Sequence, residues 1–171
     1  MPTTGSYEQV EGKPLVRFER TFPHAVSAVW DAVTDPRRLA QWFPTSVEFD
    51  VLRAGEPITF RFAEDRYPAM RGVLCEVQAP ERLVFTWGAD ELTFELAEVG
   101  GGSACRLSLA VALDSADKAA RDAAGWEQCL DRLTLVANGE EPMRPWPSES
   151  WQGYYDEYKR QGLPATAPML E

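Results

Sequence analysis

The sequence contains a single histidine, His24, and only three cysteines, Cys75, Cys105 and Cys129, which lie far apart. One imidazole excludes a His-rich metal site, and a Ser-His-Asp relay would depend on His24, which we expect at the surface before the first helix. Cysteines without a C-x-x-C pair predict reduced thiols, as is typical of cytoplasmic proteins. We therefore expect a cytoplasmic protein with no metal, no cofactor and no catalytic set of residues.

Long apolar runs and an excess of positive charge are also missing. No run approaches the ~20 apolar residues that span a bilayer, and the opening stretch MPTTGSYEQVEGK lacks the basic-then-apolar order of a secretory signal. Lysine and arginine number 17 against 27 aspartates and glutamates, which gives a net charge of -10. Such a chain repels a phosphate backbone and is not attracted to anionic lipid. Nucleic-acid and membrane partners are therefore not expected.

The chain does contain enough apolar sequence for one folded domain. Its 171 residues are 44% hydrophobic and 11% aromatic, which suits a globular protein with a sizeable core. Residues 15–22 alternate apolar and polar side chains, the pattern of a half-buried strand. Further strand-like runs follow at 47–52, 58–62, 72–78, 83–87, 92–99 and 105–113. Because short turns join them, they predict an antiparallel meander of about seven strands in all.

Segments with helical spacing of apolar residues follow the first predicted strand and the last one. Two short helices are predicted directly after the first strand, at 26–33 and 36–42, and Asp35 supplies the N-cap of the second. A long helix is predicted over 116–137, and Asn138-Gly139 ends it. Its apolar stripe is wide enough to cover one face of the sheet.

A further short helix is predicted after an extended, proline-rich linker at 143–147. It opens at Ser148 and carries an aromatic stripe at helical spacing, made of Trp151, Tyr154, Tyr155 and Tyr158. Aromatic clusters of this kind pack inside one chain or anchor contacts between subunits. We expect docking on the same chain, and a monomer and a homodimer both remain open.

Three stretches of the sequence carry a family resemblance: AVWDAVTDPRRLAQWF at 28–43, GVLCEVQAPERLVFTW at 72–87 and GWEQCLDRL at 125–133. They resemble the START/Bet v 1-like (SRPBCC) superfamily, and within it the branch named after the C-terminal domain of the activator of Hsp90 ATPase. The resemblance implies an α+β helix-grip fold, in which a curved antiparallel sheet wraps around a long C-terminal helix. It covers about residues 14–140, so we expect a domain there, flanked by an N-terminal arm at 1–13 and a C-terminal extension at 141–171.

The resemblance also implies a cavity between the sheet and the long helix, which in this superfamily often takes a small lipophilic molecule. Non-enzymatic binding of such a ligand is our leading hypothesis. An enzyme of the aromatase/cyclase kind, acting on a polyketide-like substrate, is the first alternative, and a protein that interacts with an Hsp90-type chaperone is the second. Bacterial relatives often carry a histidine three residues before the Gly-Trp pair, where this chain has Asp122. A role that needs an imidazole at that position is therefore not expected.

The residues expected to line the cavity are apolar and mostly aromatic. They are Trp42, Phe43, Phe60, Phe62, Met70, Phe85, Trp87, Phe94, Trp126, Cys129, Leu130 and Leu133. Polar groups that could enter the cavity, and serve a cyclase, are Arg61, Arg71, Tyr67 and Glu76. A cation turned into an apolar cavity would require an anionic or carbonyl group on the ligand.

The stretch AGWEQCLDRL, at 124–133, places a thiol on one face of the long helix. Cys129 would act as a nucleophile only if its pKa were lowered, and its helical neighbours are acidic or apolar. We therefore interpret it as a packing residue. Gly125 is expected to let the helix approach the sheet closely, and Trp126 to cap one end of the cavity.

Overall fold

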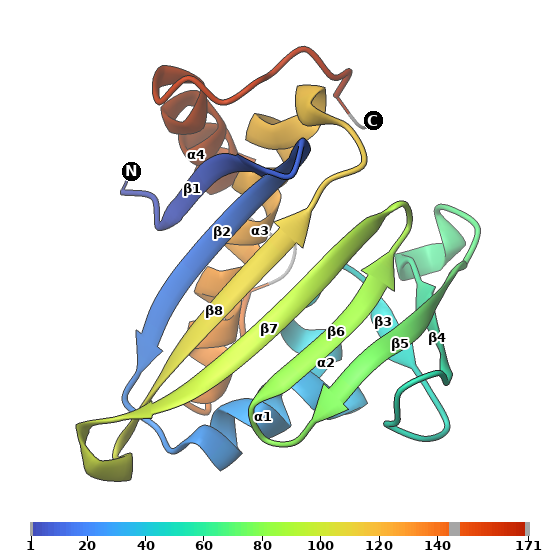
Figure 1. Ribbon diagram of the computed structural model, residues 1–171, viewed down its shortest axis with the longest axis vertical. Coiled ribbons are helices and arrows are strands. Elements are labelled where there is room, and N and C mark those ends of the chain that lie inside the picture. Colours follow the sequence, from blue (N-terminus) through green and yellow to red (C-terminus); the bar gives the residue numbers. More distant parts are fainter. Residues whose placement is uncertain (1, 144–147, 170–171) are drawn as a thin grey trace.

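A computed structural model describes residues 2–143 and 148–169. It contains one sheet of eight antiparallel strands in the order β1-β2-β8-β7-β6-β5-β4-β3, and the sheet is curved (Figure 1). The strands are β1 (Gly5–Val10), β2 (Lys13–Phe22), β3 (Ser46–Glu48), β4 (Pro57–Arg61), β5 (Met70–Gln78), β6 (Arg82–Trp87), β7 (Asp90–Val99) and β8 (Ala104–Ala112). The predicted meander is therefore confirmed, from β3 to β8.

Two details of the sheet differ from the prediction. β1 lies in the segment expected to be an arm, and it pairs with β2 along its whole length. Its side chains are mostly exposed, so it has no apolar alternation that the sequence could reveal. β3 ends at Glu48 instead of continuing to residue 52, because the chain turns at Val51, whose carbonyl accepts a hydrogen bond from the amide of Arg53.

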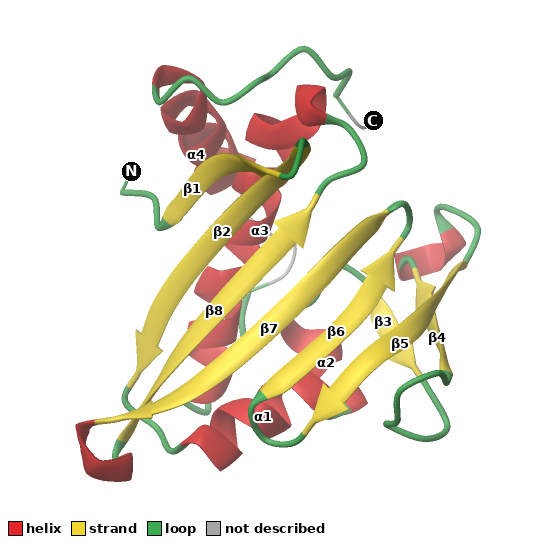
Figure 2. Cartoon of the chain, viewed as in Figure 1, coloured by secondary structure: helices red, strands yellow, loops and turns green. Residues whose placement is uncertain are grey.

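All four α-helices lie on one face of the sheet (Figure 2). They are α1 (Val26–Thr34), α2 (Pro36–Trp42), α3 (Ala119–Ala137) and α4 (Ser148–Arg160). The Asp35 side chain accepts a hydrogen bond from the Arg37 amide at 3.0 Å, which confirms the predicted N-cap of α2. The first turn of the predicted long helix, Ala116–Lys118, is a 3-10 turn, and α3 begins after it.

The core lies between the inner face of the sheet and these helices. Every second residue of β7 and β8 is buried there, as Phe94 and Leu109 illustrate. On the other side, α3 contributes a stripe that includes Leu130 and Leu133, both fully buried. The α+β helix-grip architecture expected from the sequence is therefore the observed one.

The C-terminal helix α4 packs beside α3, next to the edge of the sheet formed by β1, whose Gly5 amide donates a hydrogen bond to the Tyr158 hydroxyl at 3.0 Å. Tyr154 and Tyr158 are buried there, and their hydroxyls donate hydrogen bonds to Asp131 at 2.6 Å and Glu127 at 2.7 Å. The aromatic stripe of α4 thus docks on its own chain, as predicted. The linker expected at 143–147 lies outside the described residues except for Met143.

No helix in the described ranges combines the length and the apolar character needed to cross a bilayer. The longest, α3, has 19 residues and is amphipathic, with acidic and basic side chains among its buried alanines and leucines.

Candidate functional site

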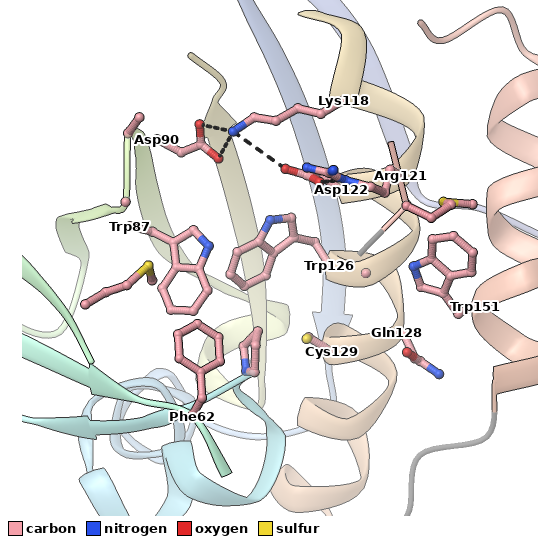
Figure 3. A pocket seen from close by; sticks show the side chains of 16 residues that line it. Phe62, Trp87, Asp90, Lys118, Arg121, Asp122, Trp126, Gln128, Cys129 and Trp151 are labelled. Carbon is pink, nitrogen blue, oxygen red and sulfur yellow. Dashed lines mark hydrogen bonds and ion pairs between the residues drawn. The ribbon is translucent and has the colours of Figure 1, made fainter. Parts of the chain in front are cut away.

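A pocket of about 600 Å³ opens beside the N-terminal half of α3 (Figure 3). β4 and β5 border it through Phe62, which directly follows β4, and Met70, and the β6–β7 hairpin through Trp87 to Asp90. α4 contributes Trp151, and the chain after α4 contributes Met169. The pocket therefore lies where one end of strands β4 to β7, the long helix and the C-terminal extension meet.

Residues of α3 form one wall of this pocket because of their helical spacing. Asp122, Gly125, Trp126 and Cys129 all line it, at i, i+3, i+4 and i+7. Such residues share one face of a helix and follow one another along its axis. The wall thus changes from charged at Asp122 to apolar at Trp126 and Cys129.

Aromatic rings from the sheet, α3 and α4 border the pocket. The rings of Trp87 and Trp126 meet edge to face, with centroids 5.9 Å apart, and Phe62 packs against Trp87 at 6.3 Å. Trp151 stacks on Tyr155, with centroids 4.9 Å apart and planes 11° apart, and this stacking fixes it at the outer side of the pocket. Figure 3 shows Trp126 between Trp87 and Trp151. Indole rings therefore border the space from both sides of α3.

The polar end of the pocket is built around Lys118. Its ammonium donates hydrogen bonds to Asp90 at 2.7 and 2.9 Å and to Asp114 at 2.5 Å. Asp90 is 5% exposed, and burial raises the pKa of this carboxyl although it accepts hydrogen bonds from Lys118 and from the Asp114 amide. Burial works against the charge of Lys118, but the hydrogen bonds to Asp114 and Asp90 outweigh it and raise its pKa.

Arg121 completes the polar end. Its Nε donates to Asp122 at 2.9 Å, and one of its terminal nitrogens donates to the backbone carbonyl of Pro168 at 2.7 Å. The second contact ties the C-terminal segment over the pocket. The Ala167 amide adds to it with a hydrogen bond to the carbonyl of Asp117 at 3.0 Å.

The residues expected to line the cavity fall into two groups. The structure brings five of them together at the pocket: Phe62, Met70, Trp87, Trp126 and Cys129. The others, namely Trp42, Phe43, Phe60, Phe85, Phe94, Leu130 and Leu133, are at most 2% exposed and fill the core instead. Close ring contacts occupy that space, for example between Phe43 and Phe60, whose centroids are 5.9 Å apart.

The polar groups nominated from the sequence all lie away from the pocket. Arg61 pairs with Glu48 at 3.0 Å, and Glu76 pairs with Arg82 at 2.5 Å. Tyr67 is 39% exposed and touches the ring of Phe62 from outside, and Arg71 is exposed. They occupy the outer face of the sheet and a loop, so a cavity ligand would not meet them.

Gly125 does not play the part expected of it. A Cβ atom at this position would meet nothing closer than Nε1 of Trp151, at 3.9 Å. The glycine therefore faces the pocket and α4, and not the sheet. Cys129 is 2% exposed, which is in keeping with the packing role expected of it, and this burial raises the pKa of its thiol to about 12.

The sequence did not indicate the ionic end of the pocket. Asp122 could have been found by extending the apolar stripe of α3 back by one turn. Asp90 and Lys118 are 28 positions apart, and no local pattern joins them. His24 contacts Asn138, with Nε2 and Oδ1 2.7 Å apart, at the far end of α3. Within the described residues no group of three His, Cys, Asp or Glu could hold a metal ion.

Several solved structures have the same fold as this chain. EF2215 from Enterococcus faecalis, a conserved protein of unknown function, has a TM-score of 0.72 at 19% identity over 91% of each chain. CalU16 from Micromonospora echinospora has a TM-score of 0.70 at 21% identity, over 94% of this chain and 98% of its own. DynU16, from the dynemicin biosynthetic locus, has a TM-score of 0.64 at 26% identity, over 78% of this chain and 51% of its own.

No curated protein sequence matches the chain. A family model does match, over residues 23–138, and these residues run from the start of α1 to the end of α3. They include strands β3 to β8, the long helix and most of the pocket described above, whereas β1 and β2 precede them. The chain belongs to the family of activator of Hsp90 ATPase homolog 1-like proteins.

Proposed function

We propose that the protein binds a small lipophilic molecule in the pocket between α3, the β6–β7 hairpin and α4. The observation that carries this proposal is the size and lining of the pocket. Its volume of about 600 Å³ lies in the ~300–1,000 Å³ range of small-molecule sites. Three tryptophans and Phe62 border it, and charged groups are confined to one end. An apolar body with a polar end would fit this arrangement.

The chemistry of the pocket favours binding over catalysis. The Cys129 thiol is a poor nucleophile because its pKa is raised to about 12. Lys118 and Arg121 are engaged with carboxylates and with a backbone carbonyl. The four polar groups that would have served a cyclase lie outside the pocket. The resemblance to DynU16, from a biosynthetic locus, is in keeping with a small organic ligand.

The test is saturable binding of an uncharged hydrophobic dye, N-phenyl-1-naphthylamine, and its loss in the variant Gly125→Leu. A leucine at position 125 projects into the pocket near Trp151, because a Cβ there has ordinary contact distance to that ring. Glycine is about 1 kcal/mol less favourable than alanine inside a helix, and leucine is close to alanine. We therefore expect dye binding to fall at least tenfold with no loss of thermal stability.

Gly125→Ala is the matched control, since it gains the same helix propensity but adds a single carbon. It should keep most of the dye binding. Native mass spectrometry of protein purified without denaturation provides a second measurement, because a bound molecule adds mass that disappears in Gly125→Leu. Absence of saturable binding to the unaltered protein, or equal binding by Gly125→Leu, would contradict the proposal.

A further inference from the structure

At the polar end of the pocket, carboxylates match the positive charges. Three carboxylates, those of Asp90, Asp114 and Asp122, surround two cations, Lys118 and Arg121. The four of these residues that line the pocket balance in charge, and Asp114, outside the lining, adds one negative charge beside Lys118. The N-terminus of α3 adds only about half a positive charge. A ligand placed at this end therefore meets cations whose charge carboxylates already balance.

The two cations are also occupied. Lys118 donates hydrogen bonds to Asp90 and Asp114, and its side chain is only 16% exposed. Arg121 donates to Asp122 and to the carbonyl of Pro168. A carboxylate or phosphate on a ligand would have to displace these partners and would leave a buried Asp90 without its counter-ion. Such an exchange is unfavourable, because a buried charge without a partner costs several kcal/mol.

One carboxylate oxygen at the pocket is less fully engaged. Asp122 accepts a hydrogen bond from Arg121 at Oδ1, but its Oδ2 lies 3.9 Å from the Lys118 ammonium, beyond hydrogen-bond length. Asp122 lines the pocket, and its side chain is 19% exposed. It can therefore accept a hydrogen bond from a ligand without losing the bond from Arg121.

Asp122 also lies next to the aromatic wall. It is four residues before Trp126 on the same face of α3, so the two side chains are separated by about 6 Å along the helix axis. Figure 3 shows both directed into the space between α3 and the β6–β7 hairpin. A cation beside Asp122 would thus lie within reach of an indole face, which attracts cations further.

Resting on the proposed binding function, we infer that the ligand is a lipophilic amine: an apolar body with a protonated nitrogen that donates to Asp122 and lies against Trp126. The pocket disfavours fatty acids and other lipophilic anions of the same size. Discrimination comes from the charge at one end, whereas the apolar body supplies most of the affinity.

The test uses three probes with the same adamantane body. They are 1-adamantylmethylamine, which is cationic, 1-adamantylmethanol, which is neutral, and 1-adamantanecarboxylate, which is anionic. Calorimetric titration of the full chain should give the order amine, alcohol, carboxylate, with the amine roughly tenfold or more tighter than the carboxylate. In Asp122→Asn the ratio of amine to carboxylate affinity should fall by about tenfold, because Arg121 loses its partner and becomes available to an anion.

Asp50→Asn is the control, since it removes one negative charge from an exposed position outside the pocket. It should leave the ratio unchanged, and thermal melting verifies that both variants are folded. Equal binding of all three probes, blocked by Gly125→Leu, would overturn the amine assignment and leave the binding function standing. An unchanged ratio in Asp122→Asn would overturn it as well. Binding of none of the probes would overturn both proposals.

Discussion

At the scale of single residues, the three cysteines differ in their surroundings. Cys129 and Cys105 are buried, and burial raises the pKa of both thiols. Cys75 is exposed on β5 and its pKa is also raised, by partial burial and by the carboxylates of Glu91 and Glu76. Access to solvent therefore decides which thiol reacts, since none is activated as a thiolate.

We expect one thiol to react quickly with a disulfide reagent such as 5,5′-dithiobis(2-nitrobenzoate) in the native protein. All three should react after unfolding in guanidinium chloride. Counting the released thionitrobenzoate by absorbance gives both numbers. In Cys75→Ser the fast phase should disappear, whereas in Cys105→Ser it should remain. Rapid reaction of a second native thiol would show that the core around α3 opens more readily than its packing indicates.

The inertness of Cys129 could be predicted from its neighbours in the sequence, because helical spacing places known residue types around it. The ion cluster of Asp90, Lys118 and Asp122 could not. Its members come from a strand and a helix that meet only in the folded chain. Pairings over such distances in the sequence depend on tertiary packing, and local periodicity carries no information about them.

At the scale of elements, a buried glutamate joins three parts of the chain. Glu127 of α3 is fully buried and accepts hydrogen bonds from Arg20 of β2 at 2.7 Å and Tyr158 of α4 at 2.7 Å. It also accepts from the amide and the hydroxyl of Thr4, which directly precedes β1. β1 and α4 are thus held to the long helix at one point, and α4 in turn holds Trp151 at the pocket.

Glu127→Ala should lower the free energy of unfolding by about 2–3 kcal/mol, because the hydroxyls of Thr4 and Tyr158 lose their acceptor and Arg20 keeps one ion pair, that with Asp131 at 2.8 Å. Urea denaturation, monitored by tryptophan fluorescence, measures this free energy of unfolding. Tyr158→Phe removes one hydrogen bond from the same cluster and keeps the ring, so its cost should be about 1 kcal/mol. Similar losses in the two variants would mean that α4 and β1 are held by packing and that the glutamate adds little.

Of the elements that Glu127 joins, α4 could be predicted from the sequence and β1 could not. α4 and its docking face follow from the spacing of Trp151, Tyr154 and Tyr158. β1 does not follow from any pattern, because an edge strand with one neighbour and exposed side chains needs no alternation. One residue of β1 does reflect its packing: Gly5 lies so close to Tyr158 and Phe18 that a Cβ atom there would collide with both.

At the scale of the whole molecule, the sequence predicts the architecture better than the empty space inside it. Alternating strands and a long amphipathic helix predict an antiparallel sheet with one face covered by that helix, and the family resemblance implies that the sheet wraps around it. How far the cavity is filled depends on side-chain packing to within the size of a methyl group. Phe43, Phe60 and Phe85 close one end of the expected cavity, whereas the end near Trp87 and Trp126 is open.

The net charge of -10 acts on a ligand before it reaches the pocket. A negative molecule raises the local concentration of cations near its surface, and salt screens this attraction, with a Debye length of ~30 Å at 0.01 M and ~10 Å at 0.1 M. Binding of 1-adamantylmethylamine should therefore weaken several-fold in calorimetric titrations between these salt concentrations, whereas 1-adamantylmethanol should bind equally well at both. The contact with Asp122 is partly buried and is screened less, so the amine should stay tighter than 1-adamantanecarboxylate at the higher concentration. An equal loss of affinity for the amine and for the alcohol would show that salt changes the protein itself and does not act through the charge of the ligand.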